Sequence, residues 1–255
     1  MPLPEASEWG FPNPSTPFGS AVYYAIRFSP AEERLRNALL YAWHDTVRQI
    51  ADCPSDPGVA RLKLDWWREE VSRMATGTAQ HPLALRLQEL ALDRQALESM
   101  HALLQAAEAA VLLPQPADDR QFAAACRARL GEFFVLLATA DGQPRDGSRE
   151  SGAYCEAIDR IRRLHSAPHG APSELVEALR HSASVASRTT RVDALLDQFE
   201  VPTGSTRAQL TPFARRLLAL AEAMHEKLRR KGYPVDETAI DRPPIANLWT
   251  AWRCR

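Results

Sequence analysis

Apolar residues recur three and four positions apart along most of this chain, which is the spacing of one face of an α-helix. Strict alternation of apolar and polar residues over the length of a strand is hard to find. Pro- and Gly-containing breaks divide the pattern into segments joined by short linkers, such as 141–147 and 166–171. No internal repeat or low-complexity stretch marks a boundary between domains. The sequence therefore predicts one all-α domain.

Residues that favour helix ends set the expected limits of each helix. Ser29 is expected to cap a first helix that begins at Pro30, with Glu32 completing a capping box. Asp56 and Pro57 are expected to start a second helix, which ends near Gly77. The predicted helices span 30–52, 56–77, 82–91, 93–112, 118–140, 148–164, 172–199 and 211–231, and a short helix follows Pro243 and Pro244.

Composition excludes several classes of protein. With 45% hydrophobic and 25% charged residues the chain can build a full globular core. Its 31 basic residues against 32 acidic ones argue against nucleic-acid binding, which needs a basic surplus. No apolar run approaches the roughly 18 residues of a spanning helix, and no signal-peptide pattern opens the chain. We expect a cytoplasmic protein with, at most, peripheral membrane contact.

Two further expectations concern the ends of the chain and the thiols. Residues 1–17 form a Pro-rich arm, and 18–255 form the predicted domain. The cysteines are far apart and form no CxxC motif, which predicts free thiols rather than disulfides or a zinc site; they are Cys53, Cys126, Cys155 and Cys254.

Two polar stripes occur on predicted helices that also carry core residues. In 30–52, the stripe residues are four, three and four positions apart and so share one face: Tyr41, Asp45, Arg48 and Asp52. In 148–164, a similar stripe consists of Glu156, Asp159 and Arg163. Periodicity leaves two interpretations open. Each stripe is either a solvated face with pairs of opposite charge, or one wall of a cavity.

Four stretches of sequence carry a resemblance to a known family. They are YYAIRFSP at 23–30, ALLYAWHDTVRQIAD at 38–52, DPGVARLKLDWWREEV at 56–71 with His81–Pro82 beyond it, and GAYCEAIDRIRRL at 152–164. RPPIANLWTAWR near the end matches more weakly. In order and interval these stretches resemble the squalene/phytoene synthase family over nearly the whole chain, and KLDWWREEV is the most specific of them.

The resemblance implies an all-α isoprenoid-synthase bundle around a central cavity. It also implies an activity, the head-to-head joining of two prenyl diphosphates. In that reaction two aspartate-rich motifs on facing helices bind Mg²⁺, which bridges the diphosphate to the protein. By the same resemblance Tyr24 and Arg27 would lie at the substrate cavity.

The chain departs from the family pattern at both motifs. The paired aspartates of the first motif align with Arg48 and Gln49, so that Asp52 alone remains, and an arginine of the family aligns with Asp45. In the second motif, an asparagine aligns with Asp159 and the leading aspartate aligns with Arg163. A guanidinium cannot ligate Mg²⁺, and it repels the metal from a neighbouring carboxylate. We therefore expect no metal or other cofactor, and loss of the metal-dependent reaction.

Two hypotheses describe the altered residues. In the first, Asp45 and Asp52 pair with Arg163 while Arg48 pairs with Asp159, so that ion pairs fill the space of magnesium and diphosphate. In the second, Arg48 and Arg163 bind an anionic head group directly, and an isoprenoid tail fills the cavity.

These hypotheses predict a binding protein rather than an enzyme. Its partner would be an isoprenoid diphosphate, another amphiphilic ligand or a protein, as for a complex I assembly factor of this fold with similarly eroded motifs. The alternative is an active prenyltransferase that condenses two farnesyl or geranylgeranyl diphosphates, with Asp52 on Mg²⁺.

Two remaining features have structural explanations. His44 is expected to be packed or solvated rather than catalytic. Trp249 and Trp252 lie three apart beside Arg253 and Arg255. We expect them to pack the last helix onto the bundle, with contact to a membrane interface as the other interpretation.

Overall fold

The segments with helical spacing of apolar residues form helices in the computed structural model. The structure describes residues 9–254 apart from 53, 55, 143–145, 183 and 236–239. The described residues form helices and no strand, so the predicted all-α fold is confirmed. The helices are α1 (Ala21–Arg27), α2 (Arg34–Asp52), α3 (Pro57–Thr76), α4 (Pro82–Gln88), α5 (Arg94–Leu112), α6 (Asp119–Cys126), α7 (Glu132–Ala140), α8 (Ser148–Arg162), α9 (Ser173–His181), α10 (Val185–Leu196), α11 (Gly204–Ala208), α12 (Pro212–Arg230) and α13 (Pro244–Arg253).

Local chemistry explains the helix ends that the sequence predicted well. The Asp56 side chain accepts a hydrogen bond from the Val59 amide, and Pro57 occupies the first position of α3. Gly77 ends that helix with a φ of +75°, a left-handed conformation that favours glycine. These ends are set by residues adjacent in sequence, which is why spacing alone located them.

The predicted cap at Ser29 is wrong. The Ser29 hydroxyl donates to the Ala25 carbonyl, 2.9 Å away, because α1 ends just before it and leaves carbonyls that need donors. A 3-10 turn at Ala31–Glu33, without a side-chain cap, then leads into α2.

Two predicted helices are interrupted. The segment 172–199 is divided into α9 and α10, because Ser182 takes an extended backbone and Ser184 caps α10 by accepting from the Ser187 amide. The segment 118–140 contains a π-helical turn at Arg127–Gly131 between α6 and α7. Helices α1 and α11 were not predicted.

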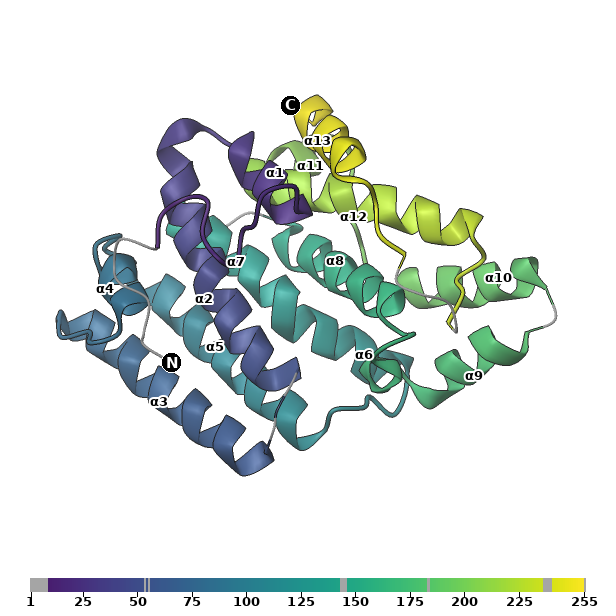
Figure 1. The fold of residues 1–255 in the computed structure, drawn as a ribbon, viewed down its shortest axis with the longest axis horizontal. Helices are drawn as coiled ribbons and strands as arrows, with labels where there is room; N and C mark the ends of the chain where they lie inside the picture. The colour runs from purple at the N-terminus through teal and green to yellow at the C-terminus, as the bar shows by residue number, and fades with distance from the viewer. Residues whose placement is uncertain are drawn as a thin grey trace.

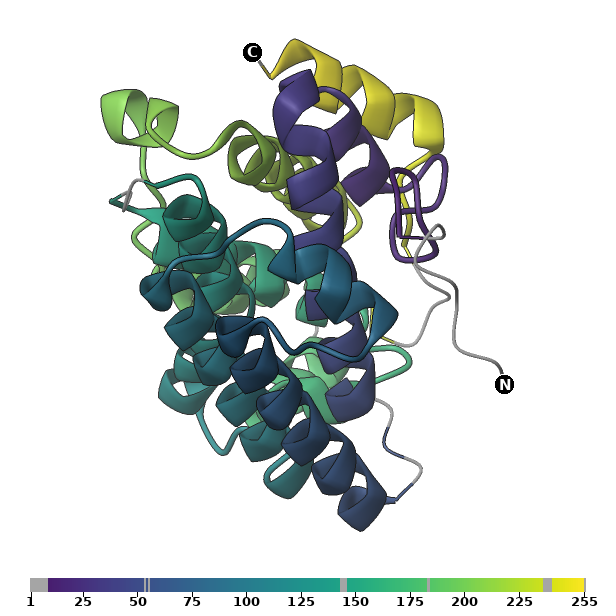
Figure 2. The same cartoon turned by 90° about the vertical axis from the view of Figure 1, so that its left-hand side faces the viewer.

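Neighbouring helices build the bundle in layers (Figures 1 and 2). Helix α5 lies between α2 and α3 and also packs on α7, while α8 packs on α7, the π-helical turn and α12. Helix α13 lies beside α1 and α12 at one end of the molecule. This order puts α2 and α8, which carry the polar stripes, on neighbouring parts of the core.

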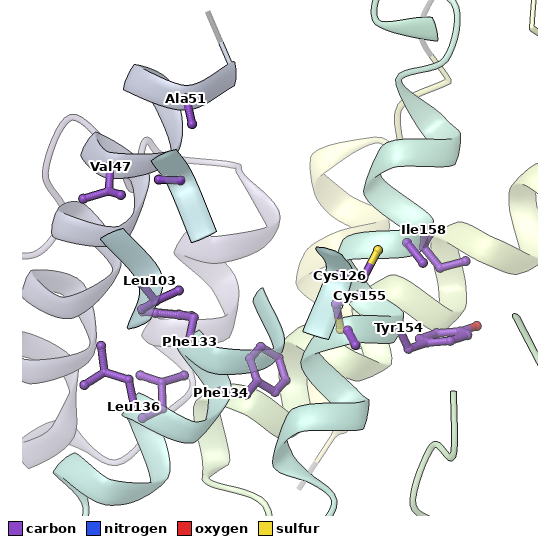
Figure 3. Close-up of a cluster of buried hydrophobic side chains, with 14 of the residues drawn as sticks. Val47, Ala51, Leu103, Cys126, Phe133, Phe134, Leu136, Tyr154, Cys155 and Ile158 are labelled. Atoms are coloured by element: carbon purple, nitrogen blue, oxygen red, sulfur yellow. The ribbon is translucent and has the colours of Figure 1, made fainter. Parts of the chain in front are cut away.

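The core of the bundle is apolar on both sides of the π-helical turn. Figure 3 shows Phe133, Phe134 and Leu136 of α7 among these buried side chains, with Leu103 of α5 beside them. Cys126 and Cys155 are buried free thiols in the same cluster.

Some predictions about the cysteines and the chain termini fall on residues outside those that the structure describes. Cys254 is also a free thiol, whereas Cys53 lies outside the described residues. The same holds for Arg255 and for positions 1–8 of the predicted arm. No helix among the described residues is both long and apolar enough to cross a bilayer.

Candidate functional site

The two polar stripes meet between α2 and the C-terminal end of α8. An Asp52 carboxylate oxygen lies 3.3 Å from the Arg163 guanidinium. Arg48 lies 3.8 Å from Asp159, so the two helices are joined at two points. These are two of the ion pairs that the first hypothesis predicts. We call the whole set the arginine–carboxylate cluster: Asp45, Arg48, Asp52, Arg129, Glu156, Asp159, Arg160 and Arg163.

Asp45 does not pair as expected. Its carboxylate accepts from Arg48 at 3.0 Å and from the Gln49 amide at 2.8 Å, both on its own helix. Residues three and four positions further along a helix lie within reach of a carboxylate, and they satisfy Asp45 locally. The predicted pair between Asp45 and Arg163 is therefore wrong. Arg163 instead pairs with Asp159, at 2.8 Å, in addition to Asp52.

Sequence reasoning missed two residues of the cluster, Arg129 and Arg160. Arg129 lies in the π-helical turn, donates to Asp52 at 2.5 Å and lies 3.5 Å from Glu156. Its side chain is 12% exposed, so it bridges the two stripes from within the bundle. A π-helical turn shifts the helical register by one residue, and a search for regular spacing cannot detect this.

Two glycines let the π-helical turn approach α8 closely. A Cβ added at Gly152 would lie 2.2 Å from the Leu130 carbonyl oxygen. One added at Gly131 would lie 2.8 Å from the Arg149 carbonyl oxygen. Both contacts are with backbone atoms, which side-chain rotation cannot relieve, so this helix contact requires glycine. The glycines are the sequence signal that could have indicated the site of Arg129.

Glu156 is the most deeply buried carboxylate of the cluster, with 2% of its surface exposed. Burial alone would raise its pKa, but Arg129, Arg160 and Arg163 outweigh it and hold the pKa well below the usual range. Arg160 donates to Glu156 at 2.8 Å and to the Gly170 carbonyl at 3.2 Å. Glu156 is thus a fixed anion whose charge is neutralised by protein cations.

His44 and Tyr41 line the apolar side of the cluster. The His44 ring stacks on Phe133 with centroids 4.4 Å apart. Burial, and then the charge of Arg48, lowers the pKa of His44 to about 3, so it is neutral. Burial raises the pKa of Tyr41 to about 12. Neither group is poised to exchange a proton near neutral pH, which agrees with the packed role expected for His44.

Little space remains between these side chains. The cavity has a volume of about 10 Å³ and is lined by His44, Val47, Arg48, Leu103, Ala107 and Arg129. A volume of this size holds about one water molecule. A larger pocket, of about 610 Å³, lies away from the cluster between α3, α4 and α5, where Met74, Leu87 and His101 line it.

The residues present do not fit a magnesium ion. Among the described residues, no group of three or more His, Cys, Asp and Glu side chains is placed to hold a metal. Asp52, Glu156 and Asp159 each face at least one arginine within 4 Å. Mg²⁺ needs oxygen ligands, and the carboxylate oxygens at this site already pair with guanidinium groups.

Tyr24 and Arg27 lie on α1, which packs on α12 and α13. Tyr24 packs against the rings of Tyr23 and Phe28, at centroid distances of 5.3 and 6.5 Å. Arg27 is exposed. The described contacts join neither residue to the arginine–carboxylate cluster, so the structure does not bring them to the two stripes.

The chain is similar in sequence and in fold to known proteins. The family model described as Squalene/phytoene synthase matches residues 16–124, which include all of α2. The matched segment belongs to the squalene/phytoene synthase family. No curated protein sequence matches the chain.

Two solved structures of this kind extend the likeness to most of the chain. The crystal structure of squalene synthase HpnC from Alicyclobacillus acidocaldarius is 20% identical, with a TM-score of 0.63 over 82% of this chain and 88% of that one. A dehydrosqualene synthase in complex with ligand is 14% identical, with a TM-score of 0.65 over 91% of this chain and 90% of that one. At these identities they show the shared isoprenoid-synthase fold, as the sequence predicted.

Proposed function

We propose that this member of the squalene/phytoene synthase family has lost magnesium-dependent prenyl transfer and serves as a protein-interaction scaffold. The observation that carries the proposal is the pairing of Arg163 with Asp52 and of Arg48 with Asp159, across the helices that would have to hold the metal. Ionisation of a prenyl diphosphate requires cations that neutralise its negative charge. These are normally Mg²⁺ ions held by carboxylates. In this chain the carboxylates are neutralised by the protein itself.

The volume of the site favours a scaffold over a ligand carrier. A cavity of about 10 Å³ does not admit a prenyl chain, and its walls include the buried side chains of Val47, Leu103 and Ala107. To open this cavity, α2 would have to separate from α5, and the ion pair that holds α2 to the end of α8 would have to break. With this site filled by its own side chains, the outer surfaces of the bundle remain for interaction.

An anion-binding role is the second candidate. The buried Nε of Arg163 has no hydrogen-bond partner among the described atoms, and Arg48 and Arg129 lie in the same cluster. A guanidinium fork matches the oxygens of a phosphate group. Such a site would bind the head group without metal.

Calorimetric titration with farnesyl diphosphate, with and without Mg²⁺, separates these functions. The scaffold proposal predicts no binding in either condition. Metal-independent binding that Arg163→Gln removes would assign the anion-binding role instead. Binding that requires Mg²⁺, with release of diphosphate, would restore the alternative of an active prenyltransferase. Arg94→Gln is a suitable control because the Arg94 side chain is 92% exposed and lies outside the cluster.

A further inference from the structure

Helix α13 has one face that the bundle leaves uncovered. Ala251 is fully buried, whereas Ile245, Trp249 and Trp252 are 70%, 52% and 44% exposed. These three are spaced by four and three residues, so they lie along one side of the helix. The rings of Trp249 and Trp252 are 5.2 Å apart. The expectation that both tryptophans pack the helix onto the bundle is therefore wrong, because other residues of α13 perform that role.

The apolar surface continues onto the segment before α1. Phe18 is 76% exposed, and its neighbour Gly19 lies against the Pro244 side chain at the start of α13. Figures 1 and 2 both show α1 and α13 side by side at one end of the molecule. We call this surface the α13 face: Phe18, Ile245, Trp249 and Trp252.

The segments that form the α13 face carry basic and no acidic side chains. No acidic residue occurs at positions 9–31 or 242–254; Glu32 and Asp241 border these segments, and Asp241 pairs with Arg162. Arg27 and Arg253 are exposed and form no ion pair with a described residue. The Arg253 guanidinium lies over the Trp249 ring, 5.1 Å from its centre. Arg242 donates to Asn247 and Thr250 and likewise has no described carboxylate partner.

The charge of the face, rather than its size, selects the occupant. In a symmetric contact with a second copy of the chain, the arginines of the two faces would meet like charge, whereas an anionic surface complements them. Tryptophan beside arginine is the composition of segments that lie in the interface of a bilayer, with rings at the level of the head groups.

We propose that the α13 face docks the protein peripherally on an anionic phospholipid surface. The tryptophans, Ile245 and Phe18 enter the interfacial layer, and Arg27 and Arg253 contact lipid phosphates. This inference is independent of the proposed function, because the face lies outside the arginine–carboxylate cluster.

Sedimentation with vesicles tests the proposal. The whole chain is mixed with vesicles of phosphatidylcholine alone or of phosphatidylcholine with phosphatidylglycerol, and bound protein and tryptophan fluorescence are measured. We expect binding to the anionic vesicles, weakened by salt, with a blue shift of the fluorescence. Ile245→Ser or Trp249→Ser should lower the affinity about tenfold. Arg253→Gln should lower it about fivefold.

Matched controls come from exposed residues elsewhere. Leu62 on α3 is 70% exposed, the same as Ile245, and α3 lies far from α13 in both views (Figures 1 and 2). Leu62→Ser and Arg94→Gln should leave binding unchanged. Absence of binding by the unaltered chain would overturn the proposal, as would equal loss in the controls. A dimer in solution that Trp249→Ser dissociates, without vesicle binding, would assign the face to a second copy and also overturn it.

Discussion

The Arg163 guanidinium lies 3.3 Å from the Asp52 carboxylate, although 111 positions separate the two residues in sequence. Asp52 ends α2 and Arg163 directly follows α8, the two segments where the family resemblance predicted aspartate-rich motifs. A cation and an anion therefore face each other where two sets of metal ligands would be expected. The pairing fixes the contact between α2 and α8 through the protein's own charges.

Replacing Arg163 should destabilise the fold. Arg163→Ala removes a cation that faces both Asp52 and Asp159, and three quarters of its side chain is buried. We expect the free energy of unfolding to fall by about 3 kcal/mol, because the carboxylates lose a partner in a poorly solvated position. Urea denaturation measures this. Arg94→Ala, at an exposed pair, should cause no measurable change. A loss of only a few tenths for Arg163→Ala would show that the cluster is solvated.

Gly152→Ala should disrupt the approach of the π-helical turn to α8. The new methyl group would meet the Leu130 carbonyl oxygen at 2.2 Å, so the backbone must move. We expect a loss of about 3 kcal/mol in the free energy of unfolding, typical of severe overpacking. Gly170→Ala is the matched control, since nothing lies within 4 Å of its Cβ position. Equal stability of the two variants would mean that this contact adjusts freely.

His44 should make stability depend on pH. Burial and the charge of Arg48 lower its pKa from the ordinary 6.5 to about 3. Below pH 6.5, His44 is therefore protonated in the unfolded chain but stays neutral in the folded chain. The stabilisation is complete above pH 6.5 and is lost as the pH falls towards 3, by about 4 kcal/mol over the window.

The test is to compare the unaltered chain with His44→Phe, which keeps the stack on Phe133 and removes the titration. The free energy of unfolding of the variant should fall less steeply between about pH 6 and pH 4. His181→Gln, at an exposed residue, should follow the unaltered chain. Parallel curves for all three proteins would mean that His44 titrates normally in the folded state.

Local sequence chemistry predicted much of the fold, and with the family resemblance it predicted two of the three expected ion pairs. Asp56 and Gly77 mark the ends of α3 because their partners are within a few residues. The spacing of Arg48 and Asp52, and of Asp159 and Arg163, placed each pair on one face, and the family resemblance indicated that the faces meet.

The rest depended on contacts that spacing does not encode. Arg129 reaches the cluster because a π-helical turn is held against Gly152 of α8, a tertiary contact. Asp45 was expected to pair with Arg163 of another segment, but it pairs with Arg48, three positions further along its own helix. Whether Trp249 faces the bundle or solvent depended on how α13 lies against α1 and α12.

The most direct test of the central claim is release of diphosphate. The purified chain is incubated with farnesyl or geranylgeranyl diphosphate in the presence of Mg²⁺, and free diphosphate and apolar products are measured over time. Because arginines pair with the carboxylates of both stripes, we predict no release above that of a sample without protein. Mg²⁺-dependent release that disappears in Asp52→Asn would contradict the account and establish an active prenyltransferase.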